Sequence, residues 1–288
     1  TEFETLNYVY VIDENGGLLS VISMKDILQR PPDSRIKDLM TAKIIKVRSH
    51  TDQERVAILA LKYNLKSIPV VDKDNRFLGI VPSDVILEIL HTEAVEDILR
   101  FAGVARYDTF SEKVFQASPQ VLTKLRLPWL ILGLLGGLVA AQIVNFFEGP
   151  LQTHFVLAAF IPLIVYMADA VGTQTETLFV RSLVYRPDIK KYFLKEIEVS
   201  FSIALILGGL LALISYLWFK LLYIGIILGI SLFFTIVTAF LLGLLVPYFL
   251  YKLNKDPAIA SGPLGTIITD ISSLIIYFAI ASIMLKLV

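Results

Sequence analysis

Residues 261–285, SGPLGTIITDISSLIIYFAIASIML, join a Gly-Pro-x-Gly chain breaker to a long apolar stretch. About 20 predominantly apolar residues form a helix that can cross the roughly 30 Å hydrocarbon core of a bilayer. Asp270 lies inside this stretch, where a carboxylate costs roughly 2.5–3.5 kcal/mol on insertion scales. A helix that begins near Pro263 places Asp270 beyond the first turn, so the helix dipole does not account for it. The stretch therefore predicts a membrane helix that carries a functional carboxylate.

The composition divides the chain into two parts. Of the 288 residues, 56% are hydrophobic and 18% are charged, and the charge is concentrated in residues 1–126. Residues 127–288 are a series of long apolar runs. We therefore expect an α-helical polytopic membrane domain preceded by a soluble α/β domain. The formal net charge of +0 gives no indication of a nucleic-acid partner, and the absence of cysteine excludes disulfides and thiolate metal sites.

Five apolar runs have the length of a transmembrane helix. They lie at about 127–147, 154–182, 198–221, 223–251 and 263–286. Lysine and arginine collect before the first run, between the second and third, and between the fourth and fifth, whereas the opposite loops carry only Lys220. By the positive-inside rule, this pattern predicts an integral protein of the inner or plasma membrane, with the soluble domain cytoplasmic and the C-terminus outside.

The soluble part contains an internal repeat. YVYVIDENGGLLSVISMKDIL (8–28) and SIPVVDKDNRFLGIVPSDVIL (67–87) both have the pattern of strand, Asp-containing turn, strand and helix start. A further stretch, 38–66, precedes only the second copy, and it predicts a strand at Ile44–Val47 followed by an amphipathic helix. We therefore expect the first repeat to be incomplete within this chain.

The repeated unit resembles a cystathionine-β-synthase-type (CBS) repeat, and the pair covers residues 1–90. The resemblance implies a cytoplasmic regulatory domain, which in this family often binds an adenine nucleotide through a Ser/Thr-x-x-Asp turn around the ribose. Ser23 and Asp26 match that turn, whereas the second copy has Pro82, Ser83 and Asp84 in the corresponding region. The alternative is a module that serves dimerisation and coupling without a nucleotide.

Residues 91–126 are expected to form a connecting helix between the CBS pair and a membrane domain at 127–288. Three acidic residues, Glu93, Glu96 and Asp97, are grouped near its start. Two interpretations stay open for them. The segment is either a solvated helical linker or a lever along the membrane surface whose acidic residues bind regulatory cations.

The membrane spans contain few ionisable residues besides Asp270. Asp169 and Glu176 lie seven residues apart in the second span and therefore share one face of a helix. Together with Thr266 and Thr269 in the last span, they offer oxygen ligands of the kind that hard cations such as Mg²⁺ prefer. Mn²⁺ and Co²⁺ accept the same ligands. For Asp169 and Glu176, a position near an interface or in a cytoplasmic vestibule is the alternative.

Two longer stretches, PLIVYMADAVGTQTETLFVRSL (162–183) and DPAIASGPLGTIITDISSLIIYF (256–278), resemble the signature stretches of the MgtE-type magnesium channels and transporters. Glu93–Ile98, EAVEDI, resembles the opening of that family's linker. The resemblance implies a homodimer with a central pore, a hydrated Mg²⁺ held at Asp270 and a further acidic residue at Asp256 on the cytoplasmic side. It also implies that the cytoplasmic domain closes the pore when intracellular Mg²⁺ is plentiful. The residues expected to line the pore or break its helices are Gly172, Gln174, Ser261, Gly262, Pro263 and Gly265.

The chain departs from the family pattern in the second span. Ala170 replaces the usual asparagine, and Asp169 and Glu176 stand where small or neutral residues are common. The leading hypothesis is a CBS-regulated divalent cation channel or transporter that is not an enzyme. The second is a Na⁺- or H⁺-coupled exchanger of the same fold that uses Asp169 and Glu176. An intramembrane aspartyl protease with an Asp169–Asp270 dyad and a non-transporting membrane sensor are further alternatives.

Overall fold

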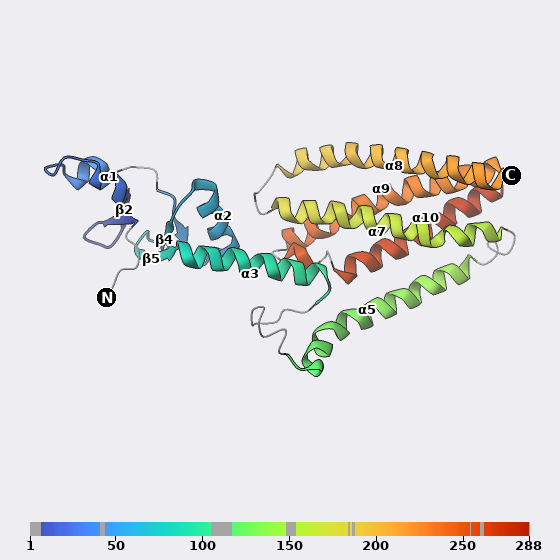
Figure 1. Ribbon diagram of the computed structural model, residues 1–288, viewed down its shortest axis with the longest axis horizontal. Coiled ribbons are helices and arrows are strands. Elements are labelled where there is room, and N and C mark those ends of the chain that lie inside the picture. The colour runs from blue at the N-terminus through green and yellow to red at the C-terminus, as the bar shows by residue number, and fades with distance from the viewer. Residues whose placement is uncertain are drawn as a thin grey trace. The chain divides into compact units, whose positions relative to one another are not determined.

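The computed structural model describes residues 7–40, 44–104, 117–147, 154–183, 185, 188–253, 255–259 and 262–287. The chain forms two compact units, Thr1–Val95 and Glu96–Val288. The described strands belong to the first unit, and the second consists mainly of long helices (Figure 1). The composition predicts the same order, an α/β domain followed by a helical domain.

Two β-hairpins with the same turn form the first unit. In one, β1 (Tyr8–Ile12) pairs antiparallel with β2 (Leu18–Ser23) and leads into α1 (Met24–Leu28). In the other, β4 (Ser67–Val71) pairs antiparallel with β5 (Phe77–Pro82) and leads into α3 (Ser83–Phe101). Asp13 Oδ1 accepts hydrogen bonds from the backbone N–H groups of residues 15 and 17, and Asp72 Oδ1 accepts them from residues 74 and 76. The repeat predicted from the sequence is therefore present in the turn geometry.

The two hairpins contact each other through their turns. The backbone N–H of Leu18 donates to Asn75 O, and that of Phe77 donates to Gly16 O. The hydroxyls of Tyr10 and Ser67 lie 2.6 Å apart in a hydrogen bond, and the Tyr10 ring stacks on Phe77. Burial of Tyr10 raises the pKa of its phenol, against the opposing effect of the Ser67 hydrogen bond. The repeats therefore pair as one body.

The second repeat also has the upstream half that the first lacks. Its helix is α2 (Gln53–Tyr63), which Asp52 caps by accepting a hydrogen bond from the N–H of Arg55. A short 3₁₀ turn, η1 (Ile36–Leu39), lies further upstream. The predicted strand at Ile44–Val47 is instead β3 (Val47–Arg48), which pairs in parallel with β4. The α2 helix buries its apolar face against β3, β4 and α3 through Val47, Val56, Ala57, Ala60, Ile68 and Ile86.

Among the described residues, five helices of the second unit are long and apolar enough to cross a membrane, as predicted. They are α5 (Pro119–Phe146), α7 (Phe155–Leu183), α8 (Ile189–Phe219), α9 (Leu222–Lys252) and α10 (Pro263–Leu285), with a 3₁₀ turn, η2 (Pro257–Ile259), before the last. Two helices start eight or more residues before their predicted spans. Asp188 caps α8 by accepting from the N–H of Lys191, and Pro119 at the first position favours an early start of α5. The apolar runs mark the segment of each helix that is suited to contact lipid, whereas α5 and α8 extend beyond that segment.

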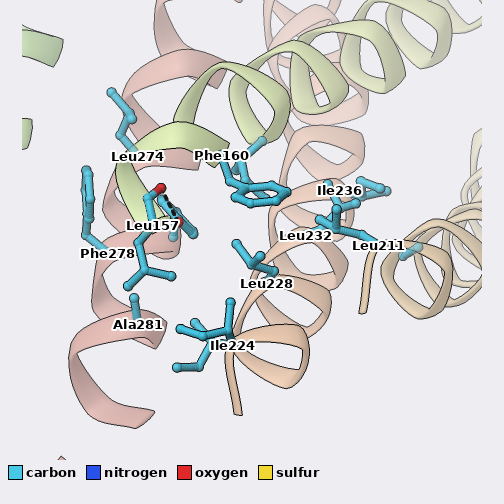
Figure 2. Close-up of a cluster of buried hydrophobic side chains, with 14 of the residues drawn as sticks. Leu157, Phe160, Leu211, Ile224, Leu228, Leu232, Ile236, Leu274, Phe278 and Ala281 are labelled. Carbon is cyan, nitrogen blue, oxygen red and sulfur yellow. Dashed lines mark hydrogen bonds between the residues drawn. The ribbon is translucent and has the colours of Figure 1, made fainter. Parts of the chain in front are cut away.

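Helix α9 is the centre of the membrane unit and packs against α7, α8 and α10. Figure 2 shows the apolar core where α7, α8, α9 and α10 meet, with Leu157, Phe160, Leu228 and Leu274 among its members. The hydroxyl of Tyr277 on α10 donates a hydrogen bond of 2.7 Å to the carbonyl of Leu157 on α7. This hydrogen bond links α10 to α7 within a cluster of apolar side chains. Helix α5 packs against α10 instead.

The glycines of the membrane unit have two different roles. Gly225 and Gly229 of α9 face Ala212 of α8 so closely that a Cβ at either position would lie under 3.0 Å from an Ala212 atom. That contact fits the close helix packing expected of a Gly-x-x-x-Gly pair. The second such pair differs, because a Cβ at Gly133 or Gly137 of α5 would meet no described atom within 4 Å. These two glycines face open space within the chain.

The connecting segment also differs from the prediction. Helix α3 begins at Ser83, within the CBS repeat, and runs without a break to Phe101. Glu93, Glu96 and Asp97 therefore lie in the middle of an existing helix and not at the start of a new one. Within 91–126, residues 91–101 lie in α3, residues 119–126 form the start of α5 (Pro119–Phe146), and residues 105–116 lie outside the described part of the chain.

Candidate cation site

The foot of α10 is built on a close approach of two backbones. Gly262 precedes the helix and Pro263 occupies its first turn, where the missing N–H of proline costs nothing. A Cβ at Gly262 would lie 2.8 Å from the carbonyl oxygen of Arg100 in the last turn of α3. Gly103 has a φ of +67°, and a Cβ there would lie 2.5 Å from Cγ of Pro263. The end of α3 and the start of α10 are therefore in a contact that glycine makes possible.

Asp270 lies two turns above this contact and borders a cavity of about 300 Å³. Gly133, Gly136 and Gly137 of α5 form one wall of the cavity, and Pro263 and Thr266 of α10 lie beside Asp270. The space is large enough for several water molecules. A divalent cation that keeps most of its hydration shell fits a space of this size.

A second and much smaller cavity lies between α7, α9 and α10. Its volume is about 10 Å³, and its walls carry the side chains of Asp169, Thr173 and Glu176 from α7 and of Thr266 and Thr269 from α10. Glu176 is 6% exposed and Thr269 is 7% exposed. The structure therefore brings Asp169 and Glu176 together with the threonines of the last span.

Most of the predicted pore residues lie at these two cavities. Gly172 and Gly265 border the small cavity, and Gly262 and Pro263 border the large one. Gln174 is exposed and borders neither of them. Ser261 lies outside the described residues.

Asp256 and the acidic residues of α3 contact side chains of the protein itself. Arg100 forms ion pairs with both Glu96 and Asp256, and Asp256 Oδ1 also accepts a hydrogen bond from the N–H of residue 258. Asp97 lies 4.0 Å from Arg181 of α7. Within the first unit, Glu93 accepts a hydrogen bond of 2.6 Å from Gln53 Nε2. Over the described ranges, no three His, Asp or Glu side chains come together in a group that could hold a metal ion.

The proposed nucleotide turn has a local structural role as well. The hydroxyl of Ser23 caps α1 by accepting a hydrogen bond from the N–H of Lys25. Asp26 lies in the first turn of that helix and is exposed.

Sequence reasoning missed Arg100, Gly103 and Gly136. The spacing of Glu96 and Arg100, four residues apart on a helix, was a signal for their ion pair. Gly136 is positioned against Ile267, to which a Cβ would come within 2.6 Å. The contacts of Arg100 with Asp256 and of Gly103 with Pro263 join segments far apart in the chain, and no local pattern indicates them.

Comparison with known families gives two matches. Residues 161–280 match the model of the MgtE family, described as a divalent cation transporter, and residues 36–92 match the CBS domain. The first match contains Asp169, Glu176 and Asp270, and the second contains most of the complete repeat.

Individual relatives cover almost the whole chain. The magnesium transporter MgtE of Bacillus subtilis is 37% identical over 97% of this chain and 62% of its own length. The MgtE of Thermus thermophilus is 36% identical over 99% of this chain and 63% of its own length. The chain thus spans somewhat less than two thirds of these relatives. A crystal structure of the cytosolic domain of the Mg²⁺ channel MgtE in complex with ATP is 42% identical over 30% of this chain and 35% of that chain, with a TM-score of 0.29.

Proposed function

This chain belongs to the MgtE family of divalent cation transporters, and from that membership we propose that it carries Mg²⁺ across the cell membrane with Asp270 as the central ion site. The observation that carries the proposal is the position of Asp270, a membrane carboxylate beside a cavity of about 300 Å³. Mg²⁺ sheds water reluctantly and is usually bound through one or two carboxylates with several waters retained. The carboxylate and the size of the cavity both suit such a hydrated ion.

The pore is proposed to lie between two copies of the chain. One Asp270 supplies a single carboxylate, and a two-fold axis near it would add the same residue from the second copy. Only 6% of the most apolar stretch of α5 is buried by the rest of the chain, which is the lowest share among the five described helices. Gly133 and Gly137 on this helix border the cavity beside Asp270, and a Cβ at either position would meet no described atom within 4 Å.

The cytoplasmic domain is proposed to gate the pore through α3. This helix leaves the CBS repeat, and its last turns contact the start of α10 and the cytoplasmic end of α7 through Arg100, Gly103 and Asp97. Divalent cations bound at the acidic residues Glu93, Glu96, Asp97 and Asp256 would compete with Arg100 and Arg181 for the same carboxylates. Regulation requires that the cations bind more tightly to the closed arrangement than to the open one.

The sidedness follows from the loop charges. Arg181 lies at the end of α7 next to Asp97 of α3, on the side that the positive-inside rule assigns to the cytoplasm. The C-terminus of α10 is then outside. An adenine nucleotide at Ser23 and Asp26 is a further regulatory proposal, and loss of nucleotide binding in Asp26→Asn tests it.

The named relatives favour this function over the protease alternative, because they are magnesium transporters. The exchanger alternative shares the fold and depends on Asp169 and Glu176.

Mg²⁺ uptake into liposomes that contain the purified protein tests the proposal. Asp270→Asn should reduce the initial rate at least tenfold, because the variant removes the charge without changing the size of the side chain. The matched control is Glu198→Gln on the exposed side of α8, which should keep the rate of the unmodified protein. Unchanged uptake in Asp270→Asn would contradict the assignment of the central ion site.

A further inference from the structure

We propose that the groove between α8 and α9 binds one membrane phospholipid, with an acyl chain in the groove and the phosphate beside Lys220. The groove has a volume of about 390 Å³ and lies near the middle of two membrane helices. The proposal concerns the lipid-facing side of the chain. It does not depend on the identity of the transported ion.

Small residues of α8 face larger residues of α9 and so leave the groove between them. Gly209 and Ala212 line it from α8, and Phe233 and Phe234 line it from α9. Each of its lining residues is a glycine or carries an apolar side chain. A polar ligand would lose its hydrogen bonds on such a surface, whereas hydrocarbon loses none.

The two helices cannot close the groove by moving together. A Cβ at Gly208 would lie 2.8 Å from the carbonyl oxygen of Gly229, and a Cβ at Gly229 would lie 2.7 Å from that of Gly208. The backbones are therefore already as close as glycine allows. A Cβ at Gly209 would meet no described atom within 4 Å, so the groove is open at this residue.

The groove is continuous with the surface that faces lipid. Helix α8 packs mainly against α9 and lies at the edge of the membrane unit (Figure 1). Leu205 and Phe234, which border the groove, are 59% and 51% exposed. In a bilayer such side chains contact acyl chains, and an unfilled space beside them forfeits dispersion contacts. An acyl chain that enters the groove makes those contacts.

The rim of the groove favours an acyl chain over a second transmembrane helix. Close helix pairs use small residues spaced four apart. The residues four before and four after Gly209 are Leu205 and Leu213, and Leu213 is 55% exposed. Since an α-helix with its side chains is about 10–12 Å wide, these leucines keep it away from Gly209. A single acyl chain is much narrower and can pass between them.

The charge distribution indicates where the headgroup lies. Between residues 199 and 251, the sequence has one charged side chain, Lys220, in the turn that joins α8 to α9. Lys220 is exposed, and the exposed aromatic residues Tyr216 and Trp218 precede it, as is typical of the interfacial region of a bilayer. Phospholipids carry an anionic phosphate in this region, which an ammonium group binds through a charge-assisted hydrogen bond.

The spacing along α8 suits a phospholipid of the leaflet on the Lys220 side. Ala212 and Ala204 lie eight and sixteen residues before Lys220, so at 1.5 Å per residue the groove is about 12–24 Å deeper in the membrane. Half of the hydrocarbon core is about 15 Å thick. The groove therefore receives the methyl end of an acyl chain whose phosphate lies at the level of Lys220.

Lipid titration of the purified full chain in detergent, followed by native mass spectrometry, tests the site. The probes are palmitoyl-oleoyl phosphatidylglycerol and palmitoyl-oleoyl glycerol, which has the same two chains without the phosphate. A single phosphatidylglycerol per chain should bind roughly tenfold more tightly than the glycerol lipid, because only the former offers a phosphate to Lys220.

Two variants separate the groove from the headgroup contact. Gly209→Leu should weaken the binding of both lipids roughly tenfold, because the leucine occupies the space of the acyl chain. Lys220→Gln should remove most of the preference for phosphatidylglycerol and leave the glycerol lipid unaffected. If Gly209→Leu does not fold, Ile230→Trp, which enlarges a partly exposed side chain of the groove, takes its place.

The matched controls are Ser202→Leu, at an exposed position of α8 outside the groove, and Lys255→Gln, an exposed cation beyond the end of α9. Both should bind the two lipids as the unmodified protein does. Equal affinity of the unmodified protein for the two lipids would overturn the site, and so would unchanged binding in Gly209→Leu or lost binding in Ser202→Leu. A change in the mass of the assembly in Gly209→Leu, with no change in bound lipid, would also overturn it in favour of a contact with a second helix. None of these results depends on Mg²⁺ flux, so a failure of the proposed function is distinguishable.

Discussion

Arg100 in the last turn of α3 forms an ion pair with Asp256, which lies just before the turn that leads into α10. The same guanidinium contacts Glu96 one helical turn earlier. One guanidinium therefore joins the end of α3 to the segment just before α10, the helix that carries Asp270. The contact lies beside the close approach of Gly103 to Pro263 at the start of α10.

Replacing Arg100 should favour closure of the pore. In Arg100→Gln, Glu96 and Asp256 lose the guanidinium that competes with divalent cations for their carboxylates, and partly exposed ion pairs contribute roughly 0.2–1 kcal/mol each. We expect Mg²⁺ flux at high internal Mg²⁺ to fall about twofold to fivefold. Liposome flux at fixed internal Mg²⁺ measures the change. Arg30→Gln, an exposed cation of the first unit, is the control, and equal flux in both variants would speak against the gating role.

A side chain at Gly103 should destabilise the membrane unit. Gly103→Ala places a Cβ 2.5 Å from Pro263 Cγ in a left-handed backbone conformation. Strain of this kind costs on the order of 1–3 kcal/mol, so the midpoint of thermal unfolding should fall by several degrees. The control is Gly209→Ala in α8, where a Cβ meets no described atom within 4 Å. A Tm as high in Gly103→Ala as in the control would show that the contact between α3 and α10 can relax.

A large side chain at Gly133 should disturb assembly without unfolding the chain. A Cβ at Gly133 would meet no described atom within 4 Å, so we expect Gly133→Leu to leave the fold of one copy intact while it narrows the cavity beside Asp270. In the proposed dimer the leucine would separate α5 from its neighbour, and the fraction of dimer should fall. Light scattering of the detergent-solubilised protein measures the mass of the assembly. An unchanged dimer would place the interface on another face.

Loss of the Tyr277 hydroxyl should cost stability but not ion selectivity. The hydroxyl of Tyr277 donates a hydrogen bond of 2.7 Å to the carbonyl of Leu157 in a buried part of the core. Tyr277→Phe leaves that carbonyl without its donor, at a cost of about 1–3 kcal/mol. Thermal unfolding measures the loss, and Tyr166→Phe, whose ring is 70% exposed, is the comparison. A similar Tm in both variants would mean that another donor or water replaces the hydroxyl.

Much of the architecture could be read from local patterns. The length of the apolar runs indicated five spans, and the repeated Asp-containing turns at Asp13 and Asp72 indicated two equivalent hairpins. The spacing of Asp169 and Glu176 put both on one helix face. The helix ends were harder to predict, because α8 and α5 begin at Asp188 and Pro119, in polar sequence outside the apolar runs.

The sequence by itself determined which segments are helices, which residues repeat and which carboxylates enter the membrane, because each of these depends on neighbours within a few turns. The tertiary structure decided what those residues face. Thr269 and Asp270 are adjacent in the chain, yet they border different cavities, because α7 and α9 cover one side of α10 and α5 covers the other. Likewise Arg100 meets Asp256, and Gly103 meets Pro263, only because packing brings α3 to the foot of α10. Such contacts depend on the packing of distant segments, to which many side chains contribute and which no short pattern encodes.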